Sequence, residues 1–197
     1  MSGAQQVLCP VSLKRMAHLG PVAWPPRPIK TERLVLRGSE ARDRAGLIEL
    51  FSSADVGTYV GGAQPREELE RTVPGTPGRR PGFFVVELGG TMIGMVTFDR
   101  RDAEHPGHVP QDAGEAELGY MFLPHAWGLG YATEACAAAL QWFASALPGE
   151  PVVLCSQTAN NQSMRVAAKL GFTEVDRFEE YGAEQWFGLW SADTATT

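Results

Sequence analysis

A glycine-containing segment between a strand-like run and a long helix constrains this chain most. Residues 127–135 read WGLGYATEA, and an apolar run at 116–123 precedes them. Apolar residues then recur at helical spacing as far as Leu147, where a Pro-Gly pair ends the pattern. A strand, a tight turn and a helix N-terminus present unpaired backbone N–H groups at the positive end of the helix dipole. Because Gly128 and Gly130 allow close approach to the backbone, the segment predicts a phosphate or pyrophosphate site.

The spacing of this segment disfavours the two common nucleotide motifs. A Walker A loop needs a Lys-Ser/Thr pair after its second glycine, where this chain has Tyr131 and Ala132. A dinucleotide fingerprint needs a third glycine at the position of Thr133. From this segment alone, a nucleotide-binding protein of Rossmann or P-loop type and an ordinary glycine loop before a core helix remain as alternatives.

Three further segments occur in a fixed order around the turn. The chain reads TERLVLR at 31–37, ELGY at 117–120 and NNQSMRVAAKLGF at 160–172, the last after an apolar run at 152–156. Together with the glycine segment, this ordered set resembles the GNAT superfamily of acyl-CoA-dependent N-acetyltransferases. The resemblance covers roughly residues 29–190. It is closest to the branch of the RimJ/RimL-type ribosomal-protein N-terminal acetyltransferases.

The order of the expected elements fits one domain with strands first and helices interleaved. This order predicts an α/β (α+β) fold, a GNAT-like three-layer sandwich with a mixed, mostly antiparallel sheet. The resemblance adds a splayed pair of central strands. We expect residues 1–28, rich in proline and without periodicity, to be a disordered tail, residues 29–190 to be the acetyltransferase domain and residues 191–197 to be a C-terminal tail. Strands are expected at 34–37, 83–88, 91–98, 115–123, 152–158, 172–178 and 185–190, and helices at 39–51, 67–73, 132–147 and within 160–170.

Composition and charge narrow the class of protein. The 197 residues carry a net charge of −6, which argues against a nucleic-acid partner because phosphate contacts need a basic surface. The sequence contains neither a membrane-span-length apolar run nor a basic, apolar leader, so we expect no membrane association and a cytoplasmic location. Cys9, Cys136 and Cys155 are odd in number and widely spaced, and two of them lie on apolar helix or strand positions, which indicates reduced, buried thiols. His105 and His108 stand in a polar loop without further ligand types, so we expect a solvated loop and no metal.

The resemblance implies acetyl-CoA as the cosubstrate, lying where the strands at 115–123 and 152–158 separate. The family's loop pattern opens with Gln or Arg where this chain has Trp127, a change that removes a polar side chain but no backbone amide. Asn160 is expected to hydrogen-bond the pantetheine amides, or else to cap the following helix. The pantetheine would pair with backbone at Met121, Phe122 and Leu123, and the pyrophosphate would lie on the amides of Gly128, Leu129, Gly130, Tyr131, Ala132 and Thr133.

Acetyl transfer to an amine requires a base and a stabilised oxyanion. Glu117 is the ionisable side chain in the core of its strand, and alternation puts it on the same face as Gly119 and Met121. We expect it to be the base, directly or through water; a strand-edge carboxylate paired with a surface arginine is the alternative. A backbone N–H near Met121 would stabilise the oxyanion. Glu134 lies opposite the apolar stripe of its helix and is expected to be solvated.

Ser163 is the expected hydrogen-bond partner of the CoA thiol, in catalysis and in cofactor binding. It shares one helix face with Val166, Ala167 and Leu170, although an N-cap is the other role that serine favours. Many family members have a tyrosine acid seven residues after the asparagine, where this chain has Ala167. Ser163 or water is therefore left for the sulfur, and a thiol pKa of about 8.5 requires little acid assistance.

These residues predict an N-acetyltransferase that transfers an acetyl group directly from acetyl-CoA to a primary amine. The resemblance favours a protein N-terminal α-amine, whose pKa of about 8 makes it easier to deprotonate than a lysine. An amine on a small molecule such as an aminoglycoside is the other acceptor class. A non-catalytic acyl-CoA-binding or regulatory module is the competing kind of protein, and both a monomer and a homodimer fit.

Overall fold

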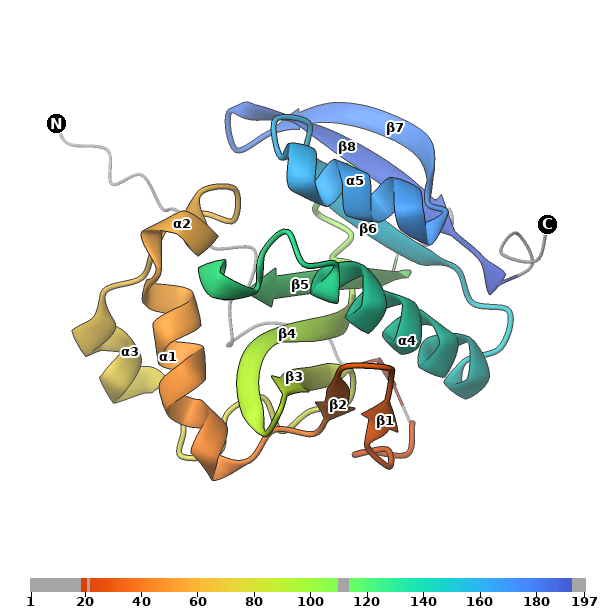
Figure 1. The fold of residues 1–197 in the computed structure, drawn as a ribbon. Coiled ribbons are helices and arrows are strands. Elements are labelled where there is room, and N and C mark those ends of the chain that lie inside the picture. Colours follow the sequence, from red (N-terminus) through yellow and green to blue (C-terminus); the bar gives the residue numbers. More distant parts are fainter. Residues whose placement is uncertain (1–18, 21, 110–113, 193–197) are drawn as a thin grey trace, which may run out of the picture.

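The computed structural model describes residues 19–20, 22–109 and 114–192, which form one sheet flanked by helices. In that part of the chain eight strands follow the order β1-β2-β3-β4-β5-β6-β8-β7 (Figure 1). Neighbouring strands are antiparallel except for β5 and β6, which are parallel, so the predicted mixed, mostly antiparallel sheet is confirmed. The strands are β1 (Ile29–Lys30), β2 (Val35–Arg37), β3 (Phe83–Leu88), β4 (Thr91–Arg100), β5 (Ala116–Phe122), β6 (Val152–Gln157), β7 (Thr173–Glu180) and β8 (Ala183–Trp190); the helices are α1 (Arg44–Ser52), α2 (Ala54–Gly57), α3 (Arg66–Thr72), α4 (Tyr131–Ala146) and α5 (Asn161–Leu170).

Helices cover both faces of the sheet and give the predicted three layers (Figure 1). The apolar stripe of α4, with Phe143 fully buried, packs with Leu118 and Phe122 of β5. Leu47 and Phe51 of α1 pack on the other side. β5 alternates between the two cores, because Ala116, Leu118 and Phe122 belong to the first and Met121 to the second.

The central strands β5 and β6 separate after a short paired stretch. They pair only as Ala116 with Val152 and Glu117 with Val153. Beyond this point β6 continues against β8 as far as Gln157, while the rest of β5 has no partner on its β6 side among the described residues. The predicted splay is therefore present, and Glu117 lies where it begins.

The apolar core extends N-terminal of the predicted domain boundary at residue 29. Leu19 is buried, and the Trp24 ring lies edge-on to Phe84 and Trp142, with centroid distances of 4.9 and 5.7 Å. A proline-rich stretch gives no periodic signal, yet single apolar side chains within it are buried. Residues 1–18 and 193–197 lie outside the described residues, so the tails predicted there stay predictions.

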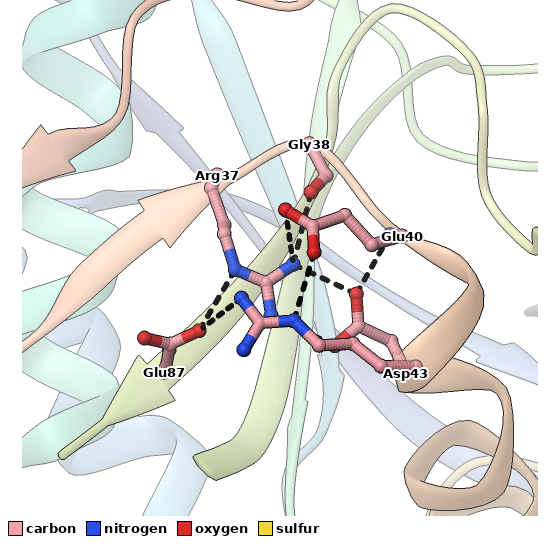
Figure 2. A network of polar contacts seen from close by, with 6 residues as sticks. Arg37, Gly38, Glu40, Asp43 and Glu87 are labelled. Carbon is pink, nitrogen blue, oxygen red and sulfur yellow. Dashed lines mark hydrogen bonds and ion pairs between the residues drawn. The ribbon is translucent and has the colours of Figure 1, made fainter. Parts of the chain in front are cut away.

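A buried ion network fastens β2 to β3 and to the start of α1 (Figure 2). Arg37 binds both carboxylate oxygens of Asp43, at 2.7 and 2.8 Å, and its Nε donates to Glu87 at 2.8 Å. Burial alone would raise the pKa of Asp43, but the hydrogen bonds from Arg37 and from the Glu40 amide outweigh it and hold that pKa low. None of these residues belongs to β5 or β6, so the network stabilises the fold away from the splay.

The loop 101–109 and the cysteines agree in part with expectation. Most of residues 102–109 are exposed, as expected, but His105 pairs with Glu180 at 2.8 Å and His108 with Glu115 at 3.1 Å. Over the described ranges no group of three His, Cys, Asp or Glu residues could hold a metal ion, and no helix is long and apolar enough to cross a membrane. Cys136 and Cys155 are free thiols; Cys136 is buried as expected but Cys155 is only partly buried, and Cys9 lies outside the described residues.

Candidate active site

The glycine segment forms an exposed turn that leads directly into α4. Gly128 and Gly130 have positive φ angles of 75° and 82°, which glycine adopts without strain. The first hydrogen bond of the helix runs from the Glu134 amide to the Gly130 carbonyl, at 3.1 Å. The amides before it, those of residues 131–133, therefore lack an intrahelical partner and can bind an anion at the positive end of the helix dipole.

Glu134 is not solvated, contrary to the sequence prediction. Its side chain is only 17% exposed and lies 2.6 Å from Arg33, while Thr31 donates to its other oxygen at 2.5 Å. Burial would raise the pKa of Glu134, but hydrogen bonds from Thr31 and Arg33 outweigh it and lower that pKa. The side of α4 opposite the apolar stripe thus faces the turn between β1 and β2, from which 101 residues separate it in sequence.

The register of β5 determines which of its amides face the splay. The Leu123 amide donates to Ile93 at 2.9 Å, and Met121 lies opposite Met95 in the same antiparallel ladder. Since alternate residues in such a ladder point their N–H groups to opposite sides, the amides of Tyr120 and Phe122 face the splay. The predicted pairing of the pantetheine with backbone at Met121, Phe122 and Leu123 stays a prediction, and in this register the amides of Met121 and Leu123 point toward β4.

The carbonyl of Phe122 already has a hydrogen-bond partner. The indole Nε1 of Trp127 donates to it at 2.7 Å, which ties the glycine segment to the end of β5. The residue that departs from the family's loop pattern therefore has a structural contact of its own. Of the predicted backbone contacts on β5, the Phe122 amide is the one that remains directed at the splay.

Glu117 lies at the start of the splay and is accessible from one side. Its side chain is 30% exposed, and its Oε2 accepts a hydrogen bond from Arg101 at 2.7 Å. Arg101 is itself buried and lies over the ring of Phe187, so it is not the surface arginine of the alternative interpretation. Burial raises the pKa of Glu117 although Arg101 and His105 oppose the change. The carboxylate is held in place by one oxygen, which leaves the other able to accept a proton.

Ser163 bonds a tyrosine across the splay instead of capping its own helix. The N-cap of α5 is Asn160, whose Oδ1 accepts from the Ser163 amide at 3.1 Å. The Ser163 hydroxyl lies 2.5 Å from the hydroxyl of Tyr120 on β5. Burial raises the pKa of Tyr120, so its proton is retained at neutral pH. The interpretation of Ser163 as the N-cap is therefore wrong. Asn160 is the N-cap of α5, which is one of the two roles predicted for it.

Tyr120 and Arg101 were not identified from the sequence. Alternation along β5 offers a signal for Tyr120, since it puts this residue on the same face as Leu118 and Phe122, toward α4 and α5. Glu117 and Met121 face the other side, where α1 packs. The splay therefore has a carboxylate on one face of β5 and a pair of hydroxyls on the other.

An apolar hollow lies on the Glu117 side of β5, next to Met121. The turn after α2 forms its outer edge, and Gln157 of β6 reaches across to donate to the Tyr59 carbonyl at 3.3 Å. The hollow is small, with room for about one water molecule. Its lining is Leu50, Phe51, Val56, Gly57, Val60, Gly62, Gln64 and Met121.

Comparison with known proteins identifies the chain as an N-acetyltransferase. The sequence model of the acetyltransferase (GNAT) domain matches residues 33–173, and the chain belongs to that family. YkkB of Bacillus subtilis is 32% identical over 148 residues, covering 72% of this chain and 82% of the relative. The N-acetyltransferase YnaD of the same organism is 27% identical, covering 80% of this chain and 91% of the relative.

Solved structures show the same fold. An acetyltransferase of the GNAT family from Bacillus anthracis superposes with a TM-score of 0.68 at 26% identity, covering 83% of this chain and 97% of that one. RimJ of Mycobacterium smegmatis, in complex with CoA-disulfide, gives 0.65 at 19% identity, covering 88% and 91%. The aminoglycoside acetyltransferase AAC(6')-Ib, in complex with coenzyme A, gives 0.65 at 15% identity, covering 82% and 96%. At these last two identities the likeness shows the fold alone.

Proposed function

We propose that this acetyltransferase uses acetyl-CoA and transfers the acetyl group directly to a primary amine bound on the Glu117 side of β5. The observation that carries the proposal is the position of Glu117 at the start of the splay, with an anion-binding helix terminus beyond the other end of β5. The diphosphate of CoA binds the amides of residues 131–133, and the pantetheine follows the free edge of β5. The related structures that hold CoA support this choice of donor.

The transfer requires one proton to leave the amine and one bond to the sulfur to break. Glu117 takes the proton of the attacking amine, directly or through water, as the nitrogen bonds to the thioester carbon. The amide of Tyr120 or Phe122 donates to the developing oxyanion, a role that backbone amides fill without reorganisation. Collapse of the intermediate breaks the C–S bond and releases the thiolate of CoA on the side of Ser163.

The Tyr120–Ser163 pair stabilises the thiolate by hydrogen bonding rather than by giving up a proton. Two hydroxyls that share one hydrogen bond leave one O–H free to donate to the sulfur. Proton transfer from Tyr120 to a thiolate would be unfavourable by roughly 2 kcal/mol or more, because the tyrosine pKa of about 10 is raised further by burial while the thiol pKa is about 8.5. The thiolate therefore takes its proton from solvent, and Glu117 returns to solvent the proton that it took from the amine.

The acceptor is a protein N-terminal α-amine in this proposal. The resemblance of the sequence motifs to the RimJ/RimL branch favours this acceptor. The α-amine is also the easier nucleophile, since lysine has a pKa more than 2 units higher, about 10.4 against about 8. An amine on a small molecule such as an aminoglycoside is the second candidate, because AAC(6')-Ib is as similar in fold as RimJ.

The experiment that tests the function is acetyl-CoA turnover across a panel of acceptors. Free CoA thiol is measured with peptides that differ in their first residue, with the same peptides blocked at the α-amine, with polyamines and with aminoglycosides. Thiol release with open peptides and none with blocked peptides is expected. Turnover with aminoglycosides alone would select the second candidate, and acetyl-CoA binding without thiol release would identify a non-catalytic module.

Loss of the tyrosine hydroxyl is expected to slow catalysis modestly. Tyr120→Phe should lower kcat by about 5- to 10-fold, the value of one hydrogen bond of roughly 1 kcal/mol, and leave the KM for acetyl-CoA nearly unchanged. Ser163→Ala should cost at least as much, and the double variant little more than Ser163→Ala, because both residues act through one chain of hydroxyls. A loss of about 10²-fold or more at neutral pH, where Tyr120 is protonated, would instead show that Tyr120 transfers a proton.

A further inference from the structure

The turn between β1 and β2 is hydrogen-bonded to the first turn of α4. These contacts have no role in the proposed chemistry. Glu134 Oε1 accepts from the hydroxyl of Thr31 at 2.5 Å and from the amide of Arg33 at 2.9 Å. Its Oε2 accepts from Arg33 Nε at 2.7 Å and lies 2.6 Å from Nη2. We call Thr31, Arg33 and Glu134 the N-terminal clamp.

The clamp also holds the glycine segment itself. Arg33 Nη1 donates to the carbonyl of Leu129 at 2.9 Å, and the guanidinium lies 4.6 Å from the centre of the Tyr131 ring. A carbonyl directed at a diphosphate would repel it, whereas the Leu129 carbonyl is bonded to a cation. The Arg33 side chain therefore contacts the residues on both sides of Gly130, which are Leu129 and Tyr131. Through Glu134 it is also bonded to the first turn of α4.

Charge alone does not explain this arrangement. Glu134 brings a carboxylate into the first turn of α4, next to the amides that the proposed diphosphate would occupy, and a negative charge there opposes an anion. Hydrogen bonds from Thr31 and Arg33 lower the pKa of Glu134, so the charge is present at neutral pH. Arg33 offsets it only in part, because the Arg33 side chain is 41% exposed and its charge is screened by solvent.

We infer that the N-terminal clamp is a positioning device that raises affinity for CoA by fixing the backbone of residues 128–133, and that Glu134 acts in it as an anchor for Arg33. The inference rests on the proposed use of CoA. It makes Arg33 and Glu134 positioning residues, because neither has to touch the ligand. A preorganised loop binds more tightly because less conformational entropy is lost on binding.

The decisive variant is Glu134→Gln. A positioning role predicts that it weakens CoA binding, whereas the loss of a negative charge alone predicts that it strengthens CoA binding. Glutamine keeps an oxygen that accepts from Thr31, but in place of the other oxygen it has an N–H group, which cannot accept from the guanidinium. The hydrogen bonds that position Arg33 are therefore lost. Titration calorimetry with CoA should give a Kd raised by roughly 5- to 50-fold, the range for one coupled polar contact network. A Kd that is unchanged or lowered would overturn the inference, since removal of a negative charge alone favours an anion.

Matched controls separate the clamp from the turn around it. Glu32→Gln makes the same change of charge at an exposed position in the same turn and should leave the Kd within about 2-fold. Arg33→Met should weaken binding about as much as Glu134→Gln, and the double variant should be less than additive. Thr31→Val removes the hydroxyl that donates to Glu134 and accepts from the Leu34 amide. It should weaken binding by about 2- to 5-fold, which keeps a test available if a larger change unfolds the protein.

A second ligand tests whether Arg33 acts by direct contact with the 3′-phosphate of CoA. Dephospho-CoA keeps the diphosphate and lacks the 3′-phosphate, so positioning predicts the same fold-loss for both ligands in Arg33→Met. A loss seen with CoA and absent with dephospho-CoA would mean that Arg33 contacts the 3′-phosphate, and the inference would be overturned. Wild-type protein that binds neither ligand would refute the proposed function itself, a result distinct from equal binding by wild type and variants.

Discussion

Glu117→Gln should lower kcat by about 10²- to 10⁴-fold at neutral pH, the usual contribution of a general base. The affinity for acetyl-CoA should stay nearly the same, because the carboxylate lies on the acceptor side of β5. Glutamine retains an oxygen that accepts from Arg101, so the buried guanidinium keeps its partner and the fold is preserved. Steady-state kinetics with an acceptor found in the turnover panel and calorimetry with acetyl-CoA measure the two effects separately.

The activities of the wild type and of Glu117→Gln should depend on pH in different ways that identify the base. Only the carboxylate form of Glu117 is a base, and burial raises its pKa, so wild-type kcat/KM should fall as pH falls through that raised value. The deficit of the glutamine variant should shrink as pH rises, because more of the acceptor amine is already neutral. Glu179→Gln, an equal change of charge at an exposed site on β7, is the control. Full activity of Glu117→Gln at neutral pH would assign the base to water or to a carboxylate of the substrate.

Gly130→Glu should weaken CoA binding by about 100-fold or more relative to Gly130→Gln. Both side chains impose the same strain at a φ of 82°, so their difference isolates the charge. A carboxylate within about 5 Å of two phosphate charges costs several kcal/mol at the effective dielectric constant of a protein surface. Arg33 Nη2 lies 3.4 Å from where the new Cβ would be and would neutralise part of the new charge. The difference of about 100-fold in affinity is therefore smaller than an unshielded carboxylate would cause.

The readout for this pair is calorimetry with CoA, accompanied by thermal unfolding to confirm that both variants fold. Equal affinity in the two variants would show that no phosphate lies near Gly130. Such a result would move the diphosphate away from the helix terminus and leave the assignment of Glu117 to be tested separately.

Local patterns in the sequence predict most of the fold. The helical spacing of apolar residues predicts α4 to within one residue at each end, and the Gly89-Gly90 turn, with φ angles of 57° and 88°, joins β3 and β4 as expected. The splay after Glu117 follows from the family resemblance and not from any local pattern. The helix predicted at 39–51 is a 3-10 turn at Ala41–Asp43 that continues directly into α1 at Arg44.

The site residues that the sequence did not reveal are joined by long-range contacts. Tyr120 and Ser163 are 43 residues apart, and Glu134 meets Arg33 across 101 residues. Periodicity shows which face of an element is apolar, but it does not show what packs against the opposite face. For this reason Glu134 looks solvated in sequence and is in fact held by the β1–β2 turn.

The most direct test is a crystal structure of the protein with CoA bound. The diphosphate oxygens should lie within hydrogen-bonding distance of the amides of residues 131–133, and the pantetheine should follow the free edge of β5 past Phe122. The sulfur should then lie near the Ser163 hydroxyl, with Glu117 on the opposite face of the strand. A CoA molecule bound outside the splay, or with its sulfur remote from both Ser163 and Glu117, would contradict the proposed site.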